Sequence, residues 1–200
     1  MDEIVDRNAR AVQGSVRVVA KVREADLSKP TPCGGWTLAD LLTHMTVQHY
    51  GFAAAAEGNG ADLSHWQPGQ PDQGSLVAGY ALAADRVMGA FAAEDILERK
   101  FCLPEVSTKV LFPARQAIGF HLVDYVVHGW DVARSLDLGY DIDPDVLDAA
   151  LVVAQAVPDD HERRHRPGAP FAPRLESASD APLDRVLTLL GRDPGWPALR

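Results

Sequence analysis

The chain has 200 residues, of which 46% are hydrophobic and 24% are charged, so it is long enough for a substantial core and is not expected to be disordered. Its formal net charge of −9 argues against nucleic acid or an anionic membrane surface as a partner, because both need a basic face. We expect a cytoplasmic protein, because the sequence shows no apolar run of about 18 residues, no secretory signal and only two cysteines.

The N-terminal half predicts three helices separated by loops rich in proline and glycine. Apolar residues recur at helical spacing over residues 2–26, and the stretch SKPTPCGGW ends that segment. The second helix begins at Thr37, which forms a capping-box-like pair with Asp40, and runs to about Glu57. The third helix is predicted over residues 75–94.

The C-terminal half predicts one long helix and several shorter elements. In chain order these are a short β-hairpin over residues 95–112, the long helix over 114–136, a helix over 143–157, an irregular arm over 158–173 and a closing helix that ends at Gly191. Four substantial helices with one apolar face each favour an all-α, antiparallel four-helix bundle. We expect residues 1–140 to form this bundle and residues 141–200 to form a helical extension packed on it, not an independent domain.

The long helix contains an unusual polar seam within the stretch FHLVDYVVHGWDVARSL, residues 120–136. At about 100° per residue, four side chains fall within one sector of about 80°, and most of the remaining positions are apolar: His121, Asp124, His128 and Asp131. An isolated buried carboxylate is costly, so these groups need each other, a cation or water as partners.

The spacing of Asp124 and His128 indicates a metal site. Residues four apart lie one turn from each other on the same helix face, so a carboxylate and an imidazole can hold one ion. A bundle needs a further ligand from a facing helix, and His44 in LADLLTHMTVQHY is the candidate. Two histidines and one carboxylate leave coordination positions open, as in catalytic sites, and suit zinc, iron, nickel or manganese.

Other interpretations of the same residues stay open from spacing alone. Asp124 and His128 are also compatible with a plain ion pair at i,i+4. Asp131 is predicted to pair with Arg134, three residues on, with orientation of His128 as the alternative. His121 is a candidate for a proton shuttle, a residue that supports the ligands or a surplus ligand. We therefore treat His121 and Asp131 as candidate catalytic residues.

Three further features near the predicted site can be read in two ways. Trp36 is predicted to lie in the core. Cys33 precedes a helix start, which would lower its pKa, although a small buried thiol is the simpler interpretation. The loop over residues 59–74 contains His65 and Trp66 and is either a lid over the site or an ordinary exposed loop.

Three motifs carry a resemblance to a known family. TPCGGWTLADLLTHM, FHLVDYVVHGWDVARSL and the closing LLGRDP resemble actinobacterial relatives of mycothiol-dependent maleylpyruvate isomerase, which belong to the DinB-like superfamily of metal-binding four-helix bundles. The resemblance implies one divalent metal, usually zinc, held by a histidine from the second helix and a Glu-x-x-x-His pair from a later helix. On this sequence those positions are His44, Asp124 and His128.

The resemblance also implies a thiol cofactor, mycothiol, which binds the metal and adds to an electrophile. Two departures accompany it. The acid here is Asp124 instead of glutamate, and the isomerase continues into a separate C-terminal domain, whereas residues 139–200 here predict only short helices and an arm rich in proline and arginine. We therefore expect fold and metal site to carry over more directly than the substrate.

Three functions are compatible with these observations. The first is a metal-dependent thiol transferase or isomerase whose partners are a small electrophile and a low-molecular-weight thiol, with zinc as the expected metal and nickel or iron as alternatives. The second is a non-enzymatic metal- or ligand-binding bundle, and the third a metal-free His/Asp acid–base enzyme. In each case we expect a monomer or a homodimer that binds neither nucleic acid nor a membrane.

Overall fold

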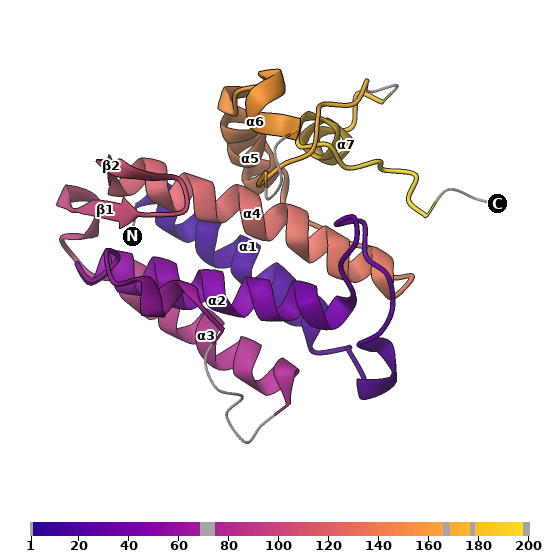
Figure 1. Cartoon of the computed structure of the whole chain (residues 1–200), viewed down its shortest axis with the longest axis horizontal. Helices are drawn as coiled ribbons and strands as arrows, with labels where there is room; N and C mark the ends of the chain where they lie inside the picture. The colour runs from indigo at the N-terminus through magenta and orange to yellow at the C-terminus, as the bar shows by residue number, and fades with distance from the viewer. Residues whose placement is uncertain (1, 69–74, 166–168, 177–178, 198–200) are drawn as a thin grey trace.

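The computed structural model describes residues 2–68, 75–165, 169–176 and 179–197. Four long helices form a bundle (Figure 1): α1 (Glu3–Val19), α2 (Leu38–Ala56), α3 (Leu76–Phe91) and α4 (Ala114–Ser135). α1 packs chiefly against α4 and α2 chiefly against α3, and contacts of α1 with α3 and of α2 with α4 close the bundle. The predicted all-α four-helix bundle is therefore confirmed.

Side-chain caps fix where three of these helices begin. The hydroxyl of Thr37 accepts a hydrogen bond from the Asp40 backbone N–H (3.3 Å), and Oδ2 of Asp40 accepts one from the Thr37 backbone N–H (2.9 Å). This is the predicted capping box. Asp2 caps α1 and Ser75 caps α3 in the same way with a single side-chain acceptor. The cap at Thr37 thus fixes the start of α2, the helix that carries His44.

The first helix is shorter than its apolar pattern predicts. The prediction extended it over residues 2–26, but α1 ends at Val19 and the chain forms a 3-10 turn, η1 (Glu24–Asp26). Val22 continues the apolar pattern and is buried, which is why the pattern overran the helix. Asp26 stabilises the turn by accepting the backbone N–H of Arg23 at 3.1 Å and pairing with its guanidinium.

The predicted hairpin forms at one end of the bundle (Figure 1). The strands β1 (Lys100–Leu103) and β2 (Ser107–Pro113) pair antiparallel, with Phe101 opposite Phe112. Phe101 is fully buried in one of the core clusters, together with side chains of α2, α3 and α4. The hairpin thus closes the core at that end and leads directly into α4.

The C-terminal segment lies along the outer side of α4 (Figure 1). Its helices are α5 (Pro144–Ala156), α6 (His161–His165) and α7 (Pro182–Leu189). α5 and α7 pack on each other, and one core cluster joins them to α1 and α4. The short α6 lies within residues 158–173, which were predicted to be irregular. Arg164 holds α6 in place, because its guanidinium donates to three backbone carbonyls.

α2 and α4 lie antiparallel, and this arrangement brings the polar seam of α4 against α2. The Tyr125 hydroxyl donates to the Met45 carbonyl, while His49 and His121 are joined by a hydrogen bond of 3.1 Å. Residue numbers therefore rise along α2 as they fall along α4. Within the described part of the chain, none of the helices combines the length and apolar character needed to cross a membrane.

Candidate metal centre

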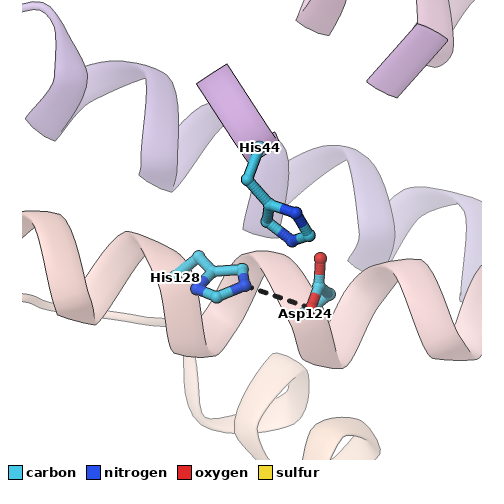
Figure 2. A group of neighbouring side chains, drawn as sticks. All are labelled: His44, Asp124 and His128. Atoms are coloured by element: carbon cyan, nitrogen blue, oxygen red, sulfur yellow. Dashed lines mark ion pairs between the residues drawn. The ribbon is translucent and has the colours of Figure 1, made fainter. Parts of the chain in front are cut away.

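The three predicted metal ligands meet between α2 and α4. One ligand atom from each of His44, Asp124 and His128 lies within 4.8 Å of the other two. Among the described residues, these three form the group of His, Cys, Asp or Glu side chains that is close enough to hold a metal ion. Nε2 of His128 is 3.4 Å from Oδ1 of Asp124. In Figure 2 the His44 ring points from α2 toward the pair on α4. Two imidazoles and a carboxylate therefore converge on one point.

A second carboxylate sets the orientation of the His128 ring. Nδ1 of His128 lies 2.9 Å from Oδ2 of Asp131, which is completely buried. A carboxylate accepts hydrogen bonds, so Nδ1 carries the proton and donates it to Asp131. Nε2 is then the ring nitrogen that faces Asp124 and the cluster. Many metal-binding histidines are oriented in this manner by a carboxylate behind the ring.

Asp131 is held by an arginine from the far end of the chain. The Arg192 guanidinium donates to it through Nε (3.2 Å to Oδ1) and Nη2 (3.2 Å to Oδ2), and Arg192 is itself only 5% exposed. Burial disfavours the ionised form of Asp131, but the charge of Arg192 and the His128 hydrogen bond outweigh it and hold the Asp131 pKa below its ordinary value. The predicted pairing of Asp131 with Arg134 is wrong: Arg134 donates to the Trp196 carbonyl instead.

The end of α7 delivers Arg192 to this position. The backbone N–H of Arg192 donates to the Leu187 carbonyl (2.8 Å) and that of Gly191 to the Thr188 carbonyl (3.1 Å). Gly191 has a φ of 77°, a left-handed conformation that glycine adopts without penalty. Together these form a Schellman motif, which reverses the chain and turns the arginine toward α4. The sequence LLGRDP therefore has a structural explanation.

Burial keeps His44 neutral near pH 7. It lowers the pKa of His44 to about 4, and the nearby His128 acts in the same direction. A neutral imidazole is the form that binds a metal. Burial also raises the pKa of the Cys33 thiol to about 11, so a lowered pKa at the helix start is not found and the thiol stays protonated.

The structure does not bring His121 to the cluster of His44, Asp124 and His128. It is completely buried in the middle of the bundle, where Nδ1 lies 2.9 Å from Nδ2 of Asn8 and Nε2 lies 3.1 Å from Nδ1 of His49. Its ring also stacks on Tyr125 with centroids 4.3 Å apart. Both ring nitrogens are therefore engaged in the core, which leaves neither for a ligand or for proton transfer at the cluster.

A cavity of about 530 Å³ opens beside His44. Its walls come from α2, the turn before it, the β-hairpin and the 3-10 turn η2 (Leu63–Trp66). The lining includes Trp36, Asp40, Thr43, Gln48, Trp66 and Glu105. We call this space the α2 cavity. It gives a small molecule access to the side of the cluster formed by His44.

Comparison with known proteins shows the family of the chain. The family model described as the mycothiol maleylpyruvate isomerase N-terminal domain matches residues 9–133, a span that contains all three clustered residues. The chain belongs to this family. Two uncharacterized proteins of Mycobacterium tuberculosis are each 30% identical to it over 190 residues, which cover 92% of this chain and 94% of theirs.

Solved structures of mycothiol-dependent maleylpyruvate isomerase share the fold. One aligns with a TM-score of 0.56 at 15% identity and covers 77% of this chain and 67% of its own. A point mutant of that isomerase gives the same TM-score and coverage at 14% identity. The family resemblance and the DinB-like fold expected from the sequence are thus confirmed.

The donor set of this maleylpyruvate isomerase relative fits a divalent metal. Two imidazoles and one carboxylate suit zinc and related ions, and three protein ligands leave room for an exogenous one. The hydrogen bond to Asp131 engages Nδ1 of His128, so Nε2 is the nitrogen that faces the cluster, and burial lowers the pKa of His44 to about 4.

Sequence reasoning missed several residues around this cluster. Trp36, predicted to be core, is partly exposed, lines the α2 cavity and has its ring centroid 4.9 Å from that of His44. Trp66, from the loop interpreted as either a lid or an ordinary exposed loop, is buried on the cavity wall. Residues 69–74 of that loop lie outside the described residues. Arg192 was part of a quoted motif, but no local pattern connected it with Asp131.

Proposed function

We propose that the protein is a metal-dependent enzyme that uses a low-molecular-weight thiol, a transferase or isomerase acting on a small electrophile. The observation that carries the proposal is the convergence of His44, Asp124 and His128 within 4.8 Å beside a cavity that admits a ligand. The family to which the chain belongs is named for mycothiol, which makes this thiol the first candidate.

The protein groups would have distinct roles in this chemistry. A divalent ion held at this site supplies Lewis acidity, which lowers the pKa of a bound thiol. Asp131 keeps the proton on Nδ1 of His128, so Nε2 remains available as a ligand. The neutral His44 contributes a second nitrogen. Asp124 reduces the positive charge of the centre by one, and its side chain is 22% exposed, so solvent reaches it.

The thiol proton must leave the site as the thiolate forms. Asp124 offers one oxygen to the metal and has a second carboxylate oxygen on a partly exposed side chain, so this oxygen and solvent in the α2 cavity are two acceptors for the proton. His121 does not contact this space, because both of its nitrogens are engaged in the core. We therefore assign the proton transfer to Asp124 or to water.

A purely metal-storing protein would be expected to surround its ion with protein ligands. The described residues supply three, and the α2 cavity lies beside them. The open side favours exchange of an exogenous ligand, and so a catalytic role over a closed structural one.

The first experiment is elemental analysis of protein purified without an affinity tag. We expect about one equivalent of zinc, nickel or iron in the wild type, and loss of that metal in His44→Ala and in His128→Ala. The matched control is His161→Ala on the exposed helix α6, which should retain the metal. An apo wild type that takes up no zinc on reconstitution would contradict the proposed centre.

The second experiment tests thiol binding directly. Protein reconstituted with Co²⁺ should develop a sulfur-to-cobalt charge-transfer band when 2-mercaptoethanol or mycothiol is added, and the band should be missing in His128→Ala. Metal binding without this band for any thiol would instead favour the non-enzymatic metal-binding function.

A further inference from the structure

Two carboxylates on the wall of the α2 cavity are held by neutral donors instead of cations. Oδ2 of Asp40 accepts hydrogen bonds from the Thr37 hydroxyl (2.6 Å) and backbone N–H (2.9 Å), which lower the Asp40 pKa. Oε2 of Glu105 accepts a hydrogen bond of 2.7 Å from Nε2 of Gln48. In the described part of the chain neither carboxylate has an ion-pair partner, and no Lys or Arg lines the cavity.

Two of the polar donors of the same wall are already used within the protein. The Thr43 hydroxyl donates to the Ala39 carbonyl at 2.8 Å. The Trp66 indole N–H donates to the Gly60 carbonyl at 2.9 Å. The charged groups that the cavity wall itself presents to a ligand are therefore the two exposed carboxylates.

The positive charge of Arg192 does not neutralise the two carboxylates of the cavity wall. The charge of Arg192 reaches His44, where it lowers the pKa, but its guanidinium is committed to the buried carboxylate of Asp131. A divalent ion at the cluster would be offset by Asp124 and by a bound thiolate. The two carboxylates of the cavity wall then remain uncompensated.

We propose that the α2 cavity binds ligand groups that donate hydrogen bonds and carry no negative charge, such as hydroxyl or ammonium groups, and disfavours carboxylates. An ionised carboxylate would meet Asp40 and Glu105 with like charge, and no Lys or Arg lines the cavity to compensate it. The inference rests on the proposed function, because it assigns the substrate class of the same site. Maleylpyruvate carries two carboxylates, so the natural electrophile here is a different, uncharged or cationic compound.

A charge series of small thiols tests this assignment. Co²⁺-loaded protein is titrated at low ionic strength with 2-aminoethanethiol (cationic), 2-mercaptoethanol (neutral) and 3-mercaptopropionate (anionic), and Kd is read from the charge-transfer band. Each Kd is then compared between wild type and Glu105→Gln, because the intrinsic thiol pKa cancels in that ratio. Glu162→Gln on α6, an exposed glutamate outside the cavity, is the matched control for net charge.

The expected changes have opposite signs for the two charged thiols. Removing one carboxylate about 7 Å from a charge in a water-like medium changes affinity about threefold. Glu105→Gln should therefore weaken the cationic thiol and strengthen the anionic thiol by about that factor and leave the neutral thiol nearly unchanged. The effect should shrink in 1 M salt. Equal ratios for all three thiols, or the same shifts in Glu162→Gln, would overturn the proposal.

A measurement without metal separates this inference from the proposed function. Ethanolamine and propionate are titrated into apo protein while the indole N–H signals of the four tryptophans are followed by NMR. We expect ethanolamine to shift Trp36 and Trp66 while propionate does not, with Trp130 and Trp196 as internal references. Propionate shifting both cavity tryptophans as strongly as ethanolamine would refute the charge preference. No charge-transfer band with any thiol would contradict the thiol function alone.

Discussion

Replacing Arg192 with methionine should damage both stability and metal binding, although the residue does not belong to the ligand cluster. Arg192 is 5% exposed and Asp131 is fully buried, so the substitution leaves a buried carboxylate with the His128 ring as its remaining side-chain hydrogen-bond partner. Breaking a buried ion pair from one side typically costs about 3–5 kcal/mol of the free energy of unfolding. We expect a loss of that size in urea denaturation at pH 7.

The same variant should bind metal more weakly. Without the guanidinium, Asp131 no longer has a fixed position from which to orient His128, and loss of such support typically lowers metal affinity about 10–100-fold. Competition for zinc with a chromophoric chelator measures this. The double variant Asp131→Asn/Arg192→Met should regain part of the lost stability, because no charge is left buried, while its zinc affinity stays low.

Arg134→Met provides the matched control. This arginine also reaches across to the C-terminal segment, but its partner is the Trp196 carbonyl, so we expect a loss of about 0.5–1.5 kcal/mol and unchanged zinc affinity. The reasoning fails if Arg192→Met is no more destabilising than Arg134→Met and binds zinc as the wild type does.

Three further predictions follow from burial, packing and ligation. Burial lowers the pKa of His121 to about 3 from 6.5. The stability that the neutral ring contributes is therefore complete above pH 6.5 and is lost as pH falls toward 3, by about 1.4 kcal/mol per pH unit. Urea denaturation of His121→Phe should show a smaller change of unfolding free energy with pH over this range, and a change equal to that of the wild type would contradict this. A Cβ at Gly51 would lie 2.4 Å from the Trp66 ring, so Gly51→Ala should cost about 1–3 kcal/mol in urea denaturation, whereas Gly89→Ala on α3, with nothing within 4 Å, should gain about 0.5–1 kcal/mol. Zinc at about 100 times its Kd should add about 2.7 kcal/mol to the free energy of unfolding, measured by denaturation with and without chelator, and His44→Ala should abolish that gain.

Local patterns were enough to predict the four bundle helices, apart from the end of the first, and the pairing of Asp124 with His128. The Thr37–Asp40 cap depends on residues three apart, and the Asp124–His128 pair depends on one helical turn. Such interactions are set mainly by backbone geometry that the sequence encodes directly. His44 required one more assumption, that the helices fold into a bundle with facing seams.

The role expected for His121 shows what a helical projection leaves out. The projection gives the angle around the axis, and there His121 and His128 nearly coincide. Seven residues also separate them by about 10.5 Å along the axis, so they meet different parts of α2. His121 meets His49, and the pair forms a buried polar contact in the core.

Contacts between residues far apart in the sequence could not be predicted either, because they depend on how separate helices dock. Asp131 and Arg192 are 61 positions apart, and their contact depends on how α7 docks on the bundle. Arg134, three residues from Asp131, had the better local geometry but turns to another partner. The acidic wall of the α2 cavity likewise combines α2 with the β-hairpin, so no single segment displays it.

The contact between Asp131 and Arg192 also has a consequence for biosynthesis. At about 5–20 residues per second, the ribosome takes about 3–12 s to add the 61 residues that follow Asp131 up to and including Arg192. During that interval the nascent chain has all three clustered residues but lacks the arginine that holds Asp131 behind His128. We therefore expect stable metal loading to follow the synthesis of Arg192.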